Sequence, residues 1–266
     1  MLVVIRGAGD IATGIALRLY RAGLQIVMCE VETPTSIRRT VCFSEAVRLG
    51  EMEVEGVTAR RADLEEIPAL LDAGIVPVLV DPAADCAAAL EPDAVVDAIL
   101  AKRNLGTTMD MAPVVVAAGP GFTAGEDCHA VVETMRGHYL GRVIYQGSAQ
   151  PDTAIPGLIG GYAGERVLRA PADGIFEGIR TIGDLVEAGD AAGYVQGQPM
   201  VCTISGTLRG LIADGVAVTK GMKCGDVDPR CEPDHCACAS DKALAVGGGV
   251  LEAILYLSGG PEAALF

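Results

Sequence analysis

The chain has 266 residues, of which 20 are Lys or Arg and 35 are Asp or Glu, so its formal net charge is −15. This acidity argues against a nucleic-acid-binding protein, which needs a basic face for contacts with phosphates. Half of the residues are hydrophobic and 21% are charged, proportions that are typical of folded globular proteins and exclude a highly charged disordered chain.

The opening residues Met1–Ile5 form an apolar run that is followed at once by Arg6 and a glycine-rich turn. Such a run is too short for the apolar region of a signal peptide or for a membrane-spanning helix. The nine cysteines, an odd number, are spread along the chain. Without an export signal they favour reduced thiols over a disulfide scaffold, and we expect a cytoplasmic protein with no membrane partner.

Short apolar runs alternate with helical stretches from residue 1 to about residue 165. The runs that are suited to buried strands are Val3–Ile5, Ile26–Met28, Val76–Val80, Val95–Val96, Val114–Val116 and Val143–Ile144. This alternation predicts an α/β fold, in which helices cover both sides of a Rossmann-like, mainly parallel sheet. Ligands of such sheets bind beyond the carboxyl ends of the strands.

The run Val3–Ile5 leads directly into the turn Gly7-Ala8-Gly9-Asp10-Ile11-Ala12. This turn fits the G-x-G-x-x-G/A pattern, whose glycines let the backbone approach a pyrophosphate at a helix N-terminus. Glu30 follows the next apolar run, where a carboxylate can accept hydrogen bonds from ribose hydroxyls. The pattern predicts a nucleotide site, with NAD(P) as one candidate cofactor. The alternative is a tight turn whose glycines serve only packing.

A second glycine-rich loop, Gly119–Gly125, follows the run Val114–Val116. We expect a helix from about Asp127 to Met135 after this loop, because apolar residues recur there at helical spacing. His129 would lie on the polar face of that helix, toward a ligand or metal in one interpretation and toward solvent in the other. The expected cofactor-binding residues at this edge of the sheet are Gly7, Gly9, Asp10, Ala12, Glu30, Gly119, Gly121 and His129.

Residues 166 to 230 contain an internal repeat. Residues 172–195 align without a gap on residues 204–227, with five glycines and two valines identical. These identities predict two copies of a short-stranded β unit. The pattern resembles the barrel-sandwich fold of biotinyl and lipoyl domains, whose modified Lys lies between the two halves. The corresponding link, residues 196–202, has no Lys, so we expect a module that docks or orients a partner and carries no swinging arm.

Four cysteines lie within 15 residues near the C-terminal end: Cys224, Cys231, Cys236 and Cys238. Cys224 aligns with Ala192 of the repeat and is assigned to the β core. Cys231, His235 and Cys236 remain on a proline-flanked loop, and we take them as the candidate catalytic residues. Their spacing is not a regular structural zinc pattern, and which metal they would bind is left open. Two thiols beside an imidazole suit a soft metal or a chalcogen; the alternative is cysteines that serve only packing.

Ser240 is expected to cap a final helix that runs to about Leu257. The predicted organisation is therefore an α/β domain at residues 1–165, a barrel-sandwich domain at 166–230, and a Cys-rich loop with a C-terminal helix at 231–266.

Several long segments resemble the YqeB-type proteins of the selenium-dependent molybdenum hydroxylase system. These segments are Ile5–Ala16, Glu32–Thr40, Gly119–Gly125, His129–His138, Arg169–Phe176 and Gly225–Cys231. The resemblance implies a cytoplasmic accessory factor that helps to mature selenium-containing molybdenum hydroxylases. It further implies handling of selenium or of the pterin-bound molybdenum cofactor.

Three hypotheses follow from the residues and the resemblance together. In the first, the α/β domain binds a nucleotide or the nucleotide-bearing molybdenum cofactor, while Cys231 and Cys236 exchange selenium or sulfur and His235 adjusts their protonation. The second is an NAD(P)-dependent oxidoreductase of the same pathway. The third is a non-catalytic scaffold whose β domain docks the hydroxylase. The expected partners are a nucleotide or pterin cofactor, a molybdenum hydroxylase and, as a further option, a second copy of the chain.

Overall fold

The computed structural model describes residues 1–260, which divide into two compact units. Unit 1 consists of Met1–Pro34, Phe43–Thr153 and the chain from Ala239 onward, and unit 2 consists of Thr35–Cys42 and Ala154–Cys238. The chain therefore enters unit 2 twice. Within residues 1–260, no helix is long and apolar enough to cross a membrane.

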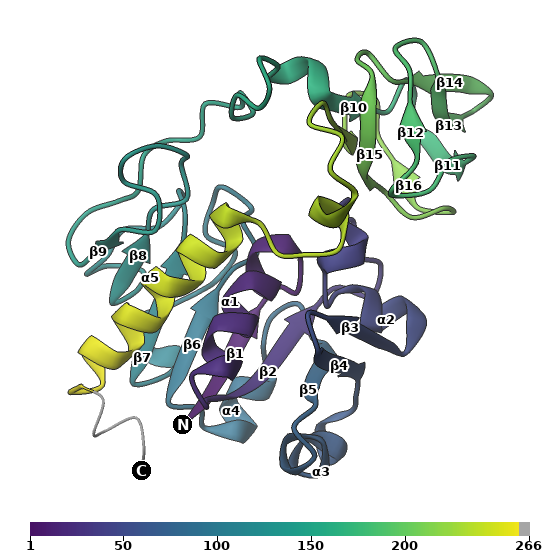
Figure 1. Ribbon diagram of the computed structural model, residues 1–266. Helices are drawn as coiled ribbons and strands as arrows, with labels where there is room; N and C mark the ends of the chain where they lie inside the picture. The colour runs from purple at the N-terminus through teal and green to yellow at the C-terminus, as the bar shows by residue number, and fades with distance from the viewer. Residues whose placement is uncertain (261–266) are drawn as a thin grey trace. The chain divides into compact units, whose positions relative to one another are not determined.

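Unit 1 is built on a nine-stranded sheet in the order β3-β4-β5-β2-β1-β6-β7-β8-β9 (Figure 1). Its strands are β1 (Leu2–Arg6), β2 (Gln25–Glu30), β3 (Glu51–Val54), β4 (Val57–Arg61), β5 (Val76–Val80), β6 (Ala94–Asp97), β7 (Val114–Ala118), β8 (Ala130–Val132) and β9 (Val143–Ile144). In this spatial order, every neighbouring pair of strands from β4 through β5, β2, β1, β6 and β7 to β8 is parallel. The two edge strands differ, because β3 runs antiparallel to β4 and β9 runs antiparallel to β8.

The predicted combination of a Rossmann-like sheet and a barrel-sandwich domain is wrong. The large sheet is mixed, and unit 2 holds two antiparallel four-stranded sheets. At one edge, Glu55 and Gly56 both adopt positive φ angles, of 50° and 79°, so the chain reverses and pairs β3 with β4 as a hairpin. At the other edge, β8 and β9 form a second antiparallel pair, with two residue pairs in register.

The predicted helix from Asp127 to Met135 is also wrong, because residues 130–132 form strand β8. All three residues of β8 are buried, and they pair with β7. His129 is part of this connection to β7. Its amide donates to the carbonyl of Val115, and its Nδ1 accepts the Val115 amide at 2.9 Å. Strand pairing therefore overrides the helical spacing of the apolar residues in this segment.

The helices of unit 1 are α1 (Asp10–Arg21), α2 (Glu45–Leu49), α3 (Ile67–Asp72), α4 (Cys86–Leu90) and α5 (Asp241–Leu257). The expected C-terminal helix is α5. Its N-cap is Ser240, whose side chain accepts the Ala243 amide at 3.1 Å. Helix α5 packs along α1 (Figure 1). Glycines permit this close approach, since a Cβ at Gly14 would lie 2.5 Å from the Cβ of Ala243.

Unit 2 has sheets in the orders β10-β17-β15-β12 and β14-β13-β11-β16. The strands are β10 (Val167–Arg169), β11 (Gly174–Gly178), β12 (Leu185–Val186), β13 (Ala191–Val195), β14 (Gln198–Val201), β15 (Gly206–Leu211), β16 (Ala217–Val218) and β17 (Lys223–Asp228). Strands β11, β12 and β13 recur 32 residues later as β15, β16 and β17, which confirms the predicted repeat of a short-stranded unit. Cys224 is fully buried in the core of unit 2, as expected.

The segment Thr35–Cys42 is an integral part of unit 2. The carbonyl of Ile37 accepts the Leu211 amide at 2.7 Å, and Arg39 Nε donates to the Leu211 carbonyl at 2.8 Å. A short 3-10 helix, Arg39–Val41, follows these contacts. The compact units thus differ from the boundaries at residues 165 and 230 that the sequence suggests, and they place α5 with the large sheet.

Candidate functional site

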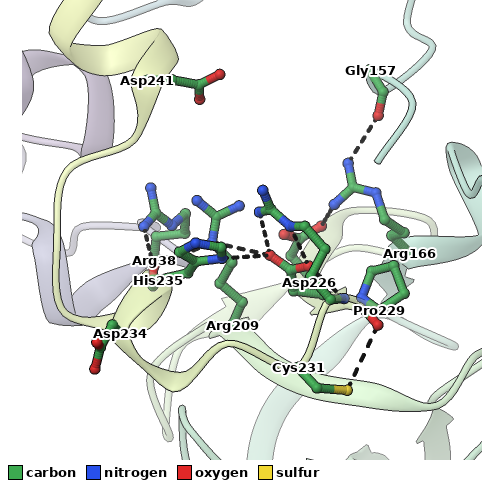
Figure 2. A network of polar contacts seen from close by, with 12 residues as sticks. Arg38, Gly157, Arg166, Arg209, Asp226, Pro229, Cys231, Asp234, His235 and Asp241 are labelled. Carbon is green, nitrogen blue, oxygen red and sulfur yellow. Dashed lines mark hydrogen bonds and ion pairs between the residues drawn. The ribbon is translucent and has the colours of Figure 1, made fainter. Parts of the chain in front are cut away.

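A network of charged side chains surrounds Asp228, the last residue of β17, in unit 2 (Figure 2). Asp228 is 1% exposed. Arg230 binds its carboxylate with two side-chain hydrogen bonds, from Nε at 2.9 Å and from Nη2 at 2.6 Å. Arg209 Nε lies 3.7 Å from Asp228 Oδ2, and His235 Nδ1 lies 3.8 Å from the same oxygen. Asp228 is therefore the centre on which two arginines and a histidine converge.

These neighbours stabilise the ionised form of the Asp228 carboxyl group. Burial alone raises the pKa of this carboxyl, but the side-chain and backbone hydrogen bonds of Arg230 and the positive charges of Arg230 and Arg209 outweigh it and lower the pKa to about 2. Asp228 is therefore ionised at neutral pH. It neutralises part of the positive charge that the arginines bring into this region.

A second buried ion pair joins Asp226, on the same strand, to Arg166, which directly precedes β10. Arg166 Nη1 is 2.8 Å from Asp226 Oδ1, and the two side chains are 6% and 7% exposed. Arg166 also donates to the carbonyl of Gly157 at 3.1 Å. Charged groups this deeply buried are tolerated only when they are paired and hydrogen-bonded. The pair fixes the chain that leads into β10 against β17.

The cysteine loop, residues 231–238, is held through its main-chain carbonyls. Arg38 Nη2 donates to the carbonyls of His235 at 2.9 Å and of Cys238 at 3.1 Å. Arg209 Nε donates to the His235 carbonyl at 3.3 Å, and the Thr40 hydroxyl donates to the Cys236 carbonyl. Figure 2 shows Arg38, Arg209 and His235 side by side at this point. A segment some 200 residues earlier in the chain thus fixes the shape of the loop.

The three cysteines of the loop differ in their exposure. Cys231 is exposed and has a positive φ of 55°, and its thiol donates to the Pro229 carbonyl at 3.7 Å. Cys236 is buried, and burial raises the pKa of its thiol, although the charges of Arg209 and Arg38 act in the opposite direction. Cys238 is half-buried and donates to the Asp234 carbonyl at 3.2 Å. Only Cys231 combines exposure with a place beside the arginine network.

The predicted group of Cys231, His235 and Cys236 is thus gathered on one loop, but its members do not act on one another directly. His235 Nδ1 lies 3.8 Å from Asp228 Oδ2, whereas the thiol of Cys231 points toward Pro229 (Figure 2). His235 Nδ1 is buried and has no hydrogen-bond partner within residues 1–260. The imidazole thus lies against Asp228 and not against either of the two thiols.

The glycine-rich turn after β1 uses its groups internally. The Gly7 amide donates to the Cys29 carbonyl at 2.7 Å, and a Cβ at Gly7 would lie 2.9 Å from the Ala98 carbonyl oxygen. The Ala8 amide, which lies within this turn, donates to Glu30 Oε2 at 2.9 Å. Gly9 is the N-cap of α1, Asp10 is the first residue of α1, and Ala12 is buried against the core. The nucleotide site at this turn stays a prediction.

Packing also accounts for the second glycine-rich loop. Gly119 and Gly121 have positive φ angles of 83° and 105°. A Cβ at Gly119 would lie 2.7 Å from Thr134 Oγ1, and a Cβ at Gly121 would lie 2.5 Å from the Arg103 amide nitrogen. His129, half-buried, is bonded to Val115 in the neighbouring strand. Seven of the eight residues proposed for a cofactor thus lie at or just beyond the carboxyl ends of β1, β2 and β7. His129 does not join them, because it precedes β8 and bonds Val115 near the start of β7.

A buried network of Arg6, Asp97 and Thr107, which the sequence patterns did not predict, lies at the same edge of the large sheet. Arg6 Nη1 lies 3.4 Å from Asp97 Oδ2, and the Thr107 hydroxyl donates to that oxygen at 2.6 Å. Burial raises the pKa of Asp97, although the bonds from Thr107 and the Ile99 amide and the charge of Arg6 lower it. Arg38, Arg166, Arg209 and Asp226 were not predicted as site residues either. Two of them had a sequence signal: Arg38 lies in the family-like segment Glu32–Thr40, and Asp226 lies in Gly225–Cys231.

Comparisons with known proteins give one strong likeness. No protein-family model matches the chain. Over 257 residues the chain is 56% identical to the uncharacterized protein YqeB of Escherichia coli (strain K12), an alignment that covers 96% of this chain and 48% of YqeB. The chain therefore spans about half the length of that relative. The match supports the YqeB family that the motifs indicate.

Likeness to solved structures is distant. An aspartoacylase family protein from Mesorhizobium loti is 13% identical, with a TM-score of 0.26 and coverage of 76% of this chain and 84% of that one. A succinylglutamate desuccinylase from Silicibacter sp. TM1040 is 14% identical, with a TM-score of 0.26 and coverage of 85% and 84%. Likenesses this weak carry no argument about what this chain does.

Proposed function

We propose that this chain is a maturation factor for selenium-dependent molybdenum hydroxylases. The proposal starts from its likeness to YqeB, which extends over about half of that protein's length. We further propose that Cys231 of unit 2 is the residue that receives the chalcogen. The observation that carries this proposal is a hydrogen-bonded contact between one family-like segment and the loop that follows another. Arg38, from Glu32–Thr40, hydrogen-bonds the loop that directly follows Gly225–Cys231.

The chemistry is a transfer of selenium between two sulfur atoms. The thiolate of Cys231 attacks the terminal selenium of a perselenide donor, R–S–SeH. A bond forms between Cys231 Sγ and selenium while the sulfur–selenium bond of the donor breaks, and the donor leaves as a thiolate, R–S⁻. The selenium is neither oxidised nor reduced overall. The terminal selenium now carried on Cys231 is available to the hydroxylase.

Cys231 suits this role better than the other cysteines of unit 2. A thiol that exchanges with an external donor has to be reachable, and Cys231 is exposed. Burial of Cys236, Cys202 and Cys224 raises the pKa of each of these thiols, which lowers the fraction of reactive thiolate at neutral pH. The side chain of Arg230, the preceding residue, is 41% exposed and brings a positive charge close to an anionic donor.

The cofactor-binding part of the function has less support from the geometry. A phosphate at the Gly7–Asp10 turn would have to displace the Glu30 carboxylate from the Ala8 amide. A carboxylate and a phosphate compete for the same donor. Chalcogen transfer at Cys231 is therefore the part of the maturation role that these contacts favour.

The proposal predicts that Cys231→Ser abolishes selenium loading. The purified chain is incubated with glutathione perselenide, and intact-protein and peptide mass spectrometry locate the added selenium. The unaltered chain is expected to gain one selenium atom on Cys231, and the variant to lose at least nine-tenths of that gain. In a host that lacks its own copy of the protein, the same variant should fail to restore hydroxylase activity.

Cys238→Ser is the matched control, because it removes a partly exposed thiol from the same loop. This control should load selenium as the unaltered chain does. The proposal would be contradicted if Cys231→Ser fully restored hydroxylase activity. It would also be contradicted if Cys236 or Cys238 of the unaltered chain gained selenium as fast as Cys231 does.

A further inference from the structure

Two further cysteines and an aspartate come together in unit 1. Cys29 lies in β2, Asp81 follows β5 directly, and Cys86 is the first residue of α4. Strands β2 and β5 are parallel neighbours, with Cys29 opposite Leu79. The two sulfur atoms are 3.4 Å apart, and the two sulfurs and a carboxylate oxygen of Asp81 all lie within 4.8 Å of one another. Both cysteines are buried.

The turn between β5 and α4 fixes two members of this Cys29–Asp81–Cys86 cluster. Asp81 Oδ1 accepts the Asp85 amide at 3.0 Å, and Oδ2 accepts the Cys86 amide at 2.8 Å. Each carboxylate oxygen keeps a second lone pair that these bonds do not use. Hydrogen bonds of this kind orient ligating carboxylates in metal sites. The position of Asp81 relative to Cys86 is therefore set before any ligand binds.

A cavity of about 380 Å³ opens beside the cluster. Asp81 and Cys86 form part of its wall, together with Arg61, Asp63 and Asp85. The cavity gives a ligand a route to the side of the cluster formed by Asp81 and Cys86, while Cys29 is only 1% exposed. It also leaves space on one side of the cluster that no side chain fills.

We propose that Cys29, Asp81 and Cys86 bind one soft divalent metal ion of the Zn²⁺ type, whose fourth coordination position faces this cavity. Thiolate sulfur and carboxylate oxygen are ligands that Zn²⁺ accepts, and three protein ligands with one open position are the arrangement of catalytic zinc sites. Two sulfurs bound at about 2.3 Å with a tetrahedral angle lie about 3.8 Å apart. The two sulfurs are already within about half an ångström of that separation, so small side-chain movements suffice.

The carboxylate distinguishes a metal site from a redox pair. Two thiols that only form a disulfide have no use for a third ligand, and a neighbouring carboxylate disfavours the thiolate that starts the reaction. A divalent cation instead draws both thiolates and the carboxylate together and offsets their charges. The open position would take water or a small anionic or thiol ligand entering from the cavity.

Cobalt(II) is the probe, because cobalt bound by cysteine sulfur absorbs in the near ultraviolet through sulfur-to-metal charge transfer. The reduced full chain is titrated with Co²⁺, and Zn²⁺ is then added in competition. We expect one equivalent of Co²⁺ to give the charge-transfer band and Zn²⁺ to abolish it. The band should persist in a chain with Cys231, Cys236 and Cys238 all replaced by Ser, which removes the loop of unit 2 as its source.

Cys86→Ser and Asp81→Asn test the ligands separately. Cys86→Ser should remove most of the band, and Asp81→Asn should weaken Co²⁺ binding by more than about 100-fold, since loss of a ligand exceeds the effect of losing an outer partner. Cys128→Ser is the matched control, because Cys128 is a fully buried thiol of the same unit outside the cluster. Circular dichroism checks that each variant is folded. An unchanged band in both ligand variants, or a Cys29–Cys86 disulfide formed with no metal bound, would overturn the proposal.

Discussion

Gly247→Ala is expected to destabilise unit 1 by about 2–3 kcal/mol, because α5 and α1 pack with no room for a side chain at this position. A Cβ at Gly247 would lie 2.8 Å from the Gly14 carbonyl oxygen and 3.1 Å from the Ile15 Cα, both of them backbone atoms. The backbone cannot yield as a flexible side chain does, so α5 would have to move away from α1. Hydrogen exchange of α1 and α5 peptides, followed by mass spectrometry, measures the loss in the full chain.

The neighbouring glycine supplies the control. A Cβ at Gly248 meets nothing within 4 Å. Gly248→Ala should therefore stabilise α5 by roughly 0.5–1 kcal/mol, the ordinary gain of replacing glycine by alanine in a helix. The two substitutions add the same methyl group one residue apart and should act in opposite directions. Protection that falls equally in both variants would contradict the described packing of α5 on α1.

Asp228→Asn is expected to destabilise unit 2 by about 3 kcal/mol, since it removes the negative charge from a buried group that binds arginines. Arg209, whose side chain is 9% exposed, would be left without the charge that lies 3.7 Å from its Nε. Faster hydrogen exchange in β15 and β17 reports the loss of stability. Asp234→Asn is the control, because Asp234 is an exposed aspartate of the neighbouring loop. If the two variants exchange alike, the Asp228 network contributes little to the stability of unit 2.

The same carboxylate predicts a pH dependence. Asp228 has a pKa of about 2 in the folded protein against its ordinary value of 3.8. A lowered pKa means that the ionised form stabilises the fold above about pH 4, and that this contribution is lost as the pH falls from about 4 toward 2. Unit 2 of the unaltered chain should lose stability over that range. Asp228→Asn should lose less there, because its contribution is already absent at neutral pH.

Local patterns predicted the interior strands of the large sheet and the edge strand β9 (Val143–Ile144), but not the hairpin at the opposite edge. Runs such as Val3–Ile5 and Val114–Val116 are buried strands, as expected. The hairpin β3–β4 was missed, although Met52 and Val54 alternate with glutamates as in a half-buried strand. The helix predicted around His129 is wrong for a different reason. Its apolar residues fit both a helix and a short strand, and only pairing with β7 decides between them.

The candidate sites show the limit of sequence reasoning more clearly. Cys231 and His235 are close in sequence, and their loop was predicted as a unit. Arg38 could not be assigned to that loop from the sequence, because only the fold of unit 2 brings residues 38 and 238 together. The Cys29–Asp81–Cys86 cluster is spread over strand β2, the residue after strand β5 and the first residue of helix α4, and none of its spacings matches a metal motif.

The double entry of the chain into unit 2 matters for anyone who wishes to dissect this protein. A fragment covering residues 154–238 retains every strand of unit 2 yet omits Thr35–Cys42. It would lose Arg38, which donates hydrogen bonds to the carbonyls of His235 and Cys238. It would also lose the Ile37 carbonyl, which accepts the Leu211 amide. A fragment of residues 154–238 is therefore an incomplete unit 2, and point substitutions in the full chain are the better way to study the cysteine loop.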